Sequence, residues 1–135
     1  MSEDDDLAVV RANSAAFSDR DVDAMLSYYA TDAVVEDKRP YGLGTFHGHA
    51  ELRPYYLSIF HSVDAMREHL DILAASEGVI VAHAELWARV PSDRTGAGVT
   101  APYGMILSIR DGKIARLEVY ADGREALEAS GLGDS

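Results

Sequence analysis

The sequence predicts an α+β fold, a cone-shaped barrel in which three N-terminal helices pack on a curved, mainly antiparallel sheet. Two observations predict it. Apolar residues recur at helical spacing up to about residue 60, and from residue 64 onward they alternate with polar residues. Helices followed by a run of hairpins are the order of an α+β domain, with the helices on one face of the sheet. A curved sheet covered in this way leaves a conical hollow between its concave face and the helices.

The three helices are expected in the first half of the chain. In residues 7–17 and 22–29, apolar residues recur three and four positions apart, and residues 19–21 separate the two runs. A third helix is expected from residue 49 or 50 to residue 60. Pro54 then lies in or near its first turn, where the missing N–H is tolerated.

The expected strands are alternating runs separated by turn signals. A short strand at residues 33–37 precedes the third helix, and a glycine-rich loop joins the two. Asp111 and Gly112 form a tight-hairpin signal, because both tolerate a positive φ. Asp122, followed by Glu125, resembles the capping box of a short terminal helix. The later strands are expected at about residues 66–74, 79–90, 100–110 and 113–121.

The length and composition indicate one domain with a single core. The 135 residues are divided into a flexible acidic N-terminus at residues 1–6, a domain at residues 7–130 and a flexible C-terminus at residues 131–135. No apolar run reaches the roughly 18 residues of a membrane span. The acidic start lacks the pattern of a signal peptide, and the absence of cysteine fits a cytoplasmic protein.

The formal net charge of -11 argues against a nucleic acid or an anionic membrane as a partner, because both require clustered Lys and Arg. No nucleotide-binding glycine motif is present, so no cofactor is expected. No metal site is expected either. The partner expected instead is a hydrophobic small molecule, in a protein that forms a homodimer.

Asp37 is the candidate catalytic base. It shares strand parity with Val35 and Ala33, so its side chain is expected to point into the same apolar hollow. A carboxylate among apolar walls has a raised pKa, because desolvation disfavours its charged form. Such a group is suited to moving protons between carbon atoms at neutral pH. The alternative interpretation is a strand-end aspartate that caps the following turn.

Asn13 lies on the apolar face of the first helix. A buried amide must find partners, so it either binds a neighbouring backbone group or contacts a ligand. The rest of the hollow is expected to be a wall suited to a polycyclic or polyketide-like molecule. The wall residues expected to bind ligand are Phe17, Val35, Phe60, Tyr103, Met105, Leu117 and Val119.

Two further residues each have two interpretations. His47 belongs to a His-Gly-His sequence, which without a matched acidic ligand is typical of loop and cap residues, although a place at the pocket rim stays open. Glu68 is a lone acid on the apolar parity of its strand. It is either a second pocket carboxylate or a residue near the frayed end of the strand.

His83 and Glu85 share one parity of the strand at residues 79–90, together with Trp87. They form either part of the convex face, with Trp87 in a dimer contact, or an acid/base pair in the pocket. The convex face is favoured, because the small apolar residues of the opposite parity pack better under helices.

The segment from Arg20 to Asp37 resembles the ketosteroid isomerase segment that ends in the catalytic aspartate. The layout of residues 7–130 is similar to the nuclear transport factor 2-like superfamily, which includes SnoaL-like polyketide cyclases and limonene epoxide hydrolase. The resemblance implies that Asp37 is the base, and that Tyr29 and Tyr56 belong to a buried hydrogen-bond network. It places Asn13 near the family's catalytic tyrosine.

The same resemblance places Met105 near the protonated aspartate of the oxyanion hole, and a methionine cannot donate a hydrogen bond. The function expected is therefore a cofactor-independent isomerase or cyclase of a steroid- or polyketide-like carbonyl compound. Asp37 would remove a proton next to the carbonyl, while Asn13 or Tyr56 stabilises the enolate. The alternatives are a non-catalytic protein that binds a small apolar ligand and a dimeric interaction module.

Overall fold

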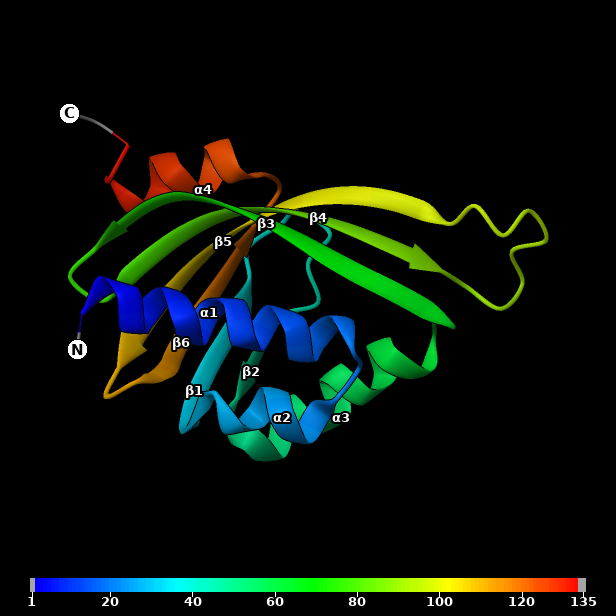
Figure 1. Cartoon of the computed structure of the whole chain (residues 1–135), viewed down its shortest axis with the longest axis horizontal. Coiled ribbons are helices and arrows are strands. Elements are labelled where there is room, and N and C mark those ends of the chain that lie inside the picture. Colours follow the sequence, from blue (N-terminus) through cyan, green and yellow to red (C-terminus); the bar gives the residue numbers. More distant parts are fainter. Residues whose placement is uncertain (1, 134–135) are drawn as a thin grey trace.

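The structure, a computed structural model, describes residues 2–133 and contains one curved sheet with helices on both faces (Figure 1). The strands are β1 (Tyr29–Asp37), β2 (Thr45–His47), β3 (Ala65–Ser76), β4 (Val79–Arg89), β5 (Val99–Arg110) and β6 (Lys113–Tyr120). The helices are α1 (Glu3–Ser18), α2 (Val22–Ser27), α3 (Gly48–His61) and α4 (Gly123–Ser130). Helices α1, α2 and α3 cover one face of the sheet, and α4 covers the other. The predicted α+β fold is confirmed.

The six strands lie in the order β2-β1-β6-β5-β4-β3. Neighbouring strands are antiparallel, except that β1 and β6 are parallel. The sheet does not close, so β2 and β3 are its edges. The parallel pair joins the first strand of the chain to the last, which places the N-terminal helices over the concave face of the β3–β6 hairpins.

The structure differs from the sequence prediction around β1. Helix α2 ends at Ser27, and Tyr29, expected in that helix, is the first residue of β1. Tyr29 pairs with Ile114 of β6 and is buried, so sheet pairing overrides its helical spacing. The loop after β1 contains the unpredicted strand β2, in which Phe46 stacks on Tyr55 of α3 with ring centroids 4.1 Å apart.

The N-terminus also differs. Residues 3–6, expected to be flexible, form the first turn of α1. Ser2 and Asp5 form a reciprocal capping box, and the acidic side chains lie at the positive end of the helix dipole. The expectations for residues 1, 134 and 135 fall outside the described residues.

Two apolar clusters hold the layers together. The larger one lies between the concave face and helices α1–α3, and includes Met25, Leu52 and Leu107. The smaller one joins the convex face to α4 through Val81, Ile106, Tyr120 and Ala126. Because successive strand residues point to opposite faces, Val81 and its neighbour Ala82 are both buried, one in each cluster.

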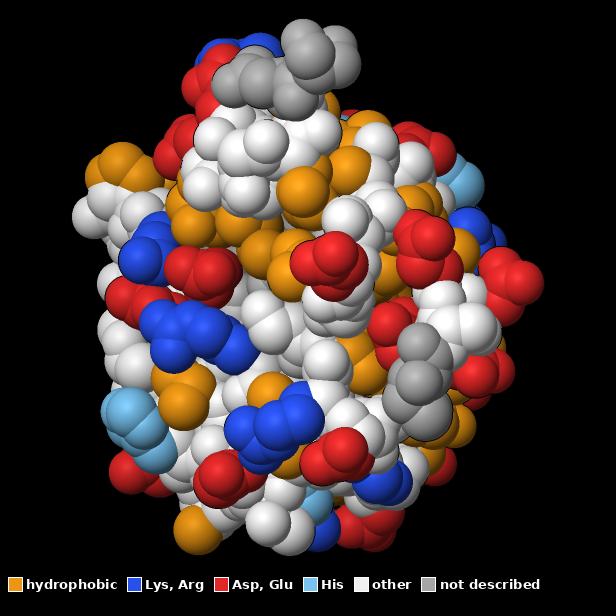
Figure 2. Space-filling model, turned by 90° about the vertical axis from the view of Figure 1, so that its left-hand side faces the viewer, with side chains coloured by type: hydrophobic (Ala, Val, Ile, Leu, Met, Phe, Trp, Pro, Cys, Tyr) orange, Lys and Arg blue, Asp and Glu red, His pale blue; other side chains and the backbone are white. Residues whose placement is uncertain are grey.

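The outer surface carries charges of both signs. On the side shown in Figure 2, acidic and basic side chains are interspersed, and the described residues there form no continuous basic surface of the kind that attracts nucleic acid. No helix within residues 2–133 combines the length and the apolar character needed to cross a bilayer.

Gly104 allows α4 to approach the sheet. A Cβ atom at this position would lie 2.0 Å from the carbonyl oxygen of Asp122, the N-cap residue of α4. That oxygen belongs to the backbone, so the clash is relieved only by moving the helix away from the sheet.

We expect Gly104→Ala to destabilise the protein by about 3 kcal/mol or more, because overpacking against backbone has no easy relaxation. Denaturant unfolding measures the loss. Gly96→Ala is the control: its φ is +72° but nothing lies near its Cβ position, so only the backbone strain of about 1 kcal/mol is expected. Equal losses in the two variants would contradict the close-approach explanation.

Candidate functional site

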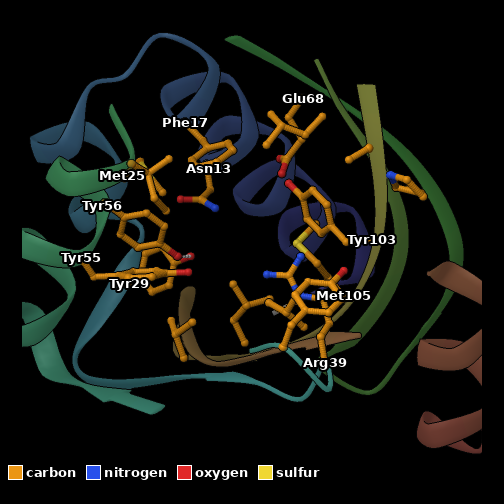
Figure 3. A pocket seen from close by; sticks show the side chains of 18 residues that line it. Asn13, Phe17, Met25, Tyr29, Arg39, Tyr55, Tyr56, Glu68, Tyr103 and Met105 are labelled. Carbon is orange, nitrogen blue, oxygen red and sulfur yellow. Dashed lines mark hydrogen bonds between the residues drawn. The ribbon is translucent and has the colours of Figure 1, made fainter. Parts of the chain in front are cut away.

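A cavity of about 300 Å³ lies between the concave face of the sheet and helices α1–α3 (Figure 3). Its walls are mainly aromatic and aliphatic, with a few polar groups, which is the usual make-up of a small-molecule site. The lining residues are Asn13, Phe17, Met25, Tyr29, Val35, Arg39, Tyr41, Tyr55, Tyr56, Ile59, Glu68, Leu86, Ala101, Pro102, Tyr103, Met105, Leu117 and Val119. Among these residues, Arg39 and Glu68 are the ones with charged side chains.

Glu68 is the carboxyl group of the cavity. It lies on β3 under α1, where Ser14 and Ser18 are one helical turn apart on the face toward the strand. The Ser14 hydroxyl donates to Glu68 Oε1 at 2.7 Å, and the Glu68 backbone N–H donates to Ser18 Oγ at 2.9 Å. Burial raises the pKa of Glu68 to about 7, although the Ser14 hydrogen bond opposes this. Near neutral pH this carboxyl can therefore both accept and donate a proton.

The pKa of Asp37 is shifted in the opposite direction to that of Glu68. Its carboxylate forms two hydrogen bonds with the Arg39 guanidinium, from Nε at 2.9 Å and from Nη2 at 2.7 Å. The backbone N–H groups of Arg39 and Leu43 donate to it as well. Burial alone would raise the pKa of Asp37, but these hydrogen bonds and the charge of Arg39 outweigh it, so the pKa lies below its ordinary value.

The expected raised pKa of Asp37 is thus wrong. The chain turns immediately after β1, and the arginine two residues on folds back over the carboxylate. Asp37 accepts from the backbone of that turn, as the capping interpretation expects, and its side chain is only 2% exposed. It is absent from the cavity wall, whereas Arg39 lines it.

A phenol pair forms the wall below α1. The hydroxyl oxygens of Tyr29 and Tyr56 lie 3.1 Å apart. Burial raises the pKa of Tyr29 to about 12 and that of Tyr56 well above its ordinary value, so both remain hydrogen-bond donors. Tyr29, Tyr56 and Glu68 line the same cavity, and the charge of Glu68 also raises the pKa of both tyrosines.

Asn13 lies beside this pair, and its amide points into the cavity (Figure 3). Its side-chain oxygen Oδ1 is buried and has no hydrogen-bond partner among the described residues. Buried polar atoms are normally paired. A ligand or water that donates to this oxygen would complete the site.

Most of the expected pocket residues meet at this cavity. Those that line it are Asn13, Phe17, Tyr29, Val35, Tyr56, Glu68, Tyr103, Met105, Leu117 and Val119. Phe60 instead lies in the core behind the wall, with its ring 5.7 Å from that of Phe17. His47 is an exposed residue that precedes α3, outside the cavity wall.

His83 and Glu85 lie on the convex face, away from the cavity. His83 Nε2 is 3.0 Å from Glu85 Oε1, and the backbone N–H of Gly123 at the start of α4 donates to His83 Nδ1 at 2.9 Å. The pair therefore holds the helix against the sheet. Trp87, of the same parity, donates its indole N–H to the carbonyl of Ala97 in the loop before β5.

The cavity wall also contains Arg39, Tyr41 and Tyr55, which the sequence pattern did not predict. Arg39 and Tyr41 lie in the loop after β1, where no periodicity predicts side-chain direction. The spacing of Asp37 and Arg39 was the available signal, because an arginine two residues from a strand-end aspartate can turn back to it. Among residues 2–133, no group of three or more potential metal ligands occurs.

Comparisons with known proteins agree with the geometry. The model of the SnoaL-like domain matches residues 9–117. A search of curated proteins by sequence finds no match.

Three solved structures illustrate the similarity of fold. A putative polyketide cyclase from Xanthomonas campestris pv. campestris is 25% identical, with 91% of this chain and 94% of that chain covered and a TM-score of 0.70. An NTF2-like protein of unknown function from Burkholderia pseudomallei is 25% identical, with 95% and 97% covered and a TM-score of 0.74. TerC, co-crystallised with polyporic acid, is 23% identical, with 97% and 99% covered and a TM-score of 0.72.

The pKa of Glu68 predicts how stability depends on pH. The carboxyl is easier to protonate in the folded protein, with a pKa of about 7, than at its ordinary value of 4.5. Its stabilising contribution is therefore complete below pH 4.5 and is lost as the pH rises through about 7.

We expect wild type to lose on the order of 3 kcal/mol relative to Glu68→Gln across this interval. Glutamine keeps the acceptor for Ser14 and does not titrate. Urea unfolding at a series of pH values measures both proteins. A constant difference between them from pH 4.5 to 8 would contradict the raised pKa.

Proposed function

The chain belongs to the SnoaL-like domain family, and from this premise we propose that it catalyses proton transfer on a hydrophobic carbonyl compound, as a cofactor-independent isomerase or cyclase. One observation carries the proposal: Glu68, with a pKa of about 7, faces a largely apolar cavity. A base with a pKa near the working pH is the most effective proton carrier. The putative polyketide cyclase of similar fold and the neighbour crystallised with an organic small molecule support a small-molecule substrate.

In the proposed reaction, ionised Glu68 removes a proton from the carbon next to the carbonyl group. The C–H electron pair moves into the enolate, and the proton taken up by the carboxyl exchanges with water. The carboxylic acid then delivers a proton to the same carbon, to another carbon or, when the enolate has closed a ring on a second carbonyl, to the alkoxide oxygen formed there. No redox partner is required. A positioned acid/base group contributes roughly 10²- to 10⁴-fold to the rate.

The enolate oxygen is stabilised by donors of the opposite wall. The hydroxyls of Tyr29 and Tyr56 stay protonated at neutral pH, and the amide of Asn13 lies beside them. One such donor contributes roughly 10²- to 10³-fold. These groups take the place of the family's oxyanion hole, in which Met105 cannot act.

Asp37 has a different role in this proposal. A carboxylate with a lowered pKa that already accepts four hydrogen bonds is a weak base. We assign to it the positioning of Arg39. If Asp37 itself were the base, Asp37→Asn would lose the activity and Glu68→Gln would keep it, so the two variants distinguish the two assignments.

The test is deuterium incorporation from D₂O into the α-carbon of a panel of cyclic enones and polyketide-like ketones, followed by NMR. We expect Glu68→Gln to lower the exchange rate roughly 10²- to 10⁴-fold, and Asp37→Asn to lower it less than about tenfold. The wild-type rate should rise with pH through about 7, as Glu68 loses its proton.

The reverse pattern, in which Asp37→Asn abolishes exchange and Glu68→Gln does not, would make Asp37 the base. Saturable binding of the panel without exchange would favour the non-catalytic ligand-binding protein of the same fold. Thermal unfolding of both variants controls for loss of structure, and Glu51→Gln, at the exposed start of α3, controls for removal of a carboxylate elsewhere.

A further inference from the structure

Arg39 presents unused hydrogen-bond donors to the cavity. A guanidinium group carries five N–H donors. Asp37 accepts from Nε and from one hydrogen of Nη2, which together form one edge of the group. Nη1 has no hydrogen-bond partner among the described residues, and the guanidinium points into the cavity (Figure 3). The ion pair therefore leaves one edge of the arginine free on the ligand side.

The pair is held rigidly before any ligand arrives. Asp37 is 2% exposed and is fixed by the backbone N–H groups of Arg39 and Leu43. The guanidinium carbon lies 5.2 Å from the centre of the Tyr41 ring. A preorganised donor binds more tightly, because little side-chain freedom is lost on binding.

A purely structural role explains the pair incompletely. Asp37 already caps the turn after β1 through backbone N–H groups, which requires no arginine. The hydrogen bonds to Asp37 outweigh the cost of burying the guanidinium, because the pKa of Arg39 is raised, but they use only the Nε and Nη2 edge. The pairing with Asp37 does not explain why Nη1 is left without a hydrogen-bond partner among the described residues, on a guanidinium that points into the cavity.

The walls next to Arg39 are aromatic. Tyr41, Tyr55 and Tyr103 line the cavity, and the stacking of Tyr55 on Phe46 fixes its ring. Tyr55 and Arg39 line the same cavity, and burial raises the pKa of Tyr55. Flat rings stack favourably on such walls.

We propose that the free edge of Arg39 binds a carboxylate carried by a flat ring compound. Guanidinium and carboxylate match in charge and planar geometry, and such hydrogen bonds are stronger than neutral ones. The inference rests on the proposed function and narrows its substrate to an organic acid. The acidic group binds at Arg39, while the reacting carbonyl lies between Glu68 and the tyrosine pair.

The test compares 2-naphthoate with 2-naphthamide, which have the same shape and differ in charge, by isothermal titration calorimetry. At a pH below 7, where Glu68 is mostly protonated, wild type should bind the naphthoate at least about tenfold more tightly. Arg39→Met should weaken naphthoate binding about tenfold and leave naphthamide binding nearly unchanged. Arg39→Lys, which keeps the charge without the planar fork, should be intermediate.

Arg53→Met is the matched control, because Arg53 pairs with Asp23 on the surface and lies outside the cavity wall. It should bind both probes as wild type does. Equal affinity of wild type for the two probes, an equal loss of both in Arg39→Met, or the same loss in Arg53→Met would overturn the proposal. So would the absence of naphthoate binding to wild type.

Glu68→Gln separates this proposal from the proposed function. It should bind naphthoate as tightly as wild type, since the acid site lies at Arg39. Naphthoate selectivity that depends on Arg39, in a protein that exchanges no α-proton, would support the acid site and refute the catalytic function. Proton exchange that depends on Glu68, without any preference for naphthoate over naphthamide, would support the catalytic function and refute the acid site at Arg39.

Discussion

The ion pair between Asp37 and Arg39 determines which groups of the cavity are free to act. The guanidinium and two backbone N–H groups donate to the aspartate, so its pKa is lowered, and Asp37 is absent from the cavity wall. Glu68 receives a hydrogen bond from Ser14 but no ion pair with a basic side chain among the described residues. Burial therefore outweighs the hydrogen bond from Ser14 and raises the pKa of Glu68 to about 7. The pKa values of these two acidic residues are thus shifted in opposite directions, because Arg39 pairs with Asp37 and not with Glu68.

Hydrogen bonds between the helices and the concave face of the sheet hold the polar groups of the cavity in place. Helix α1 places Ser14 and Ser18 over β3, and α3 brings Tyr56 against Tyr29 at the start of β1. Each contact joins a helix to the concave face. The helices therefore do more than cover the sheet, because they orient Glu68 and the pair Tyr29 and Tyr56. Arg39 and Tyr41 belong instead to the loop after β1.

Much of this was predictable from the sequence, and the exceptions have physical causes. Alternation in the second half and the Asp111-Gly112 turn predict the hairpins, and the apolar parity of β3 places Glu68 among possible pocket residues. The character of Asp37 was not predictable from parity, since its pKa depends on a loop side chain that returns to it. Tyr29 lies in a strand because it pairs with Ile114 of β6. That partner is more than 80 residues away in the sequence, so the local pattern around Tyr29 did not predict the pairing.

The hydroxyl of Ser14 acts on Glu68 from behind the wall. It is absent from the cavity lining, yet its hydrogen bond favours the ionised carboxylate. Acidity and shape are therefore set by different residues of this protein. Substitution at that serine would move the range of acidity in which the carboxyl gives up its proton, while the contour that selects the ligand stays the same.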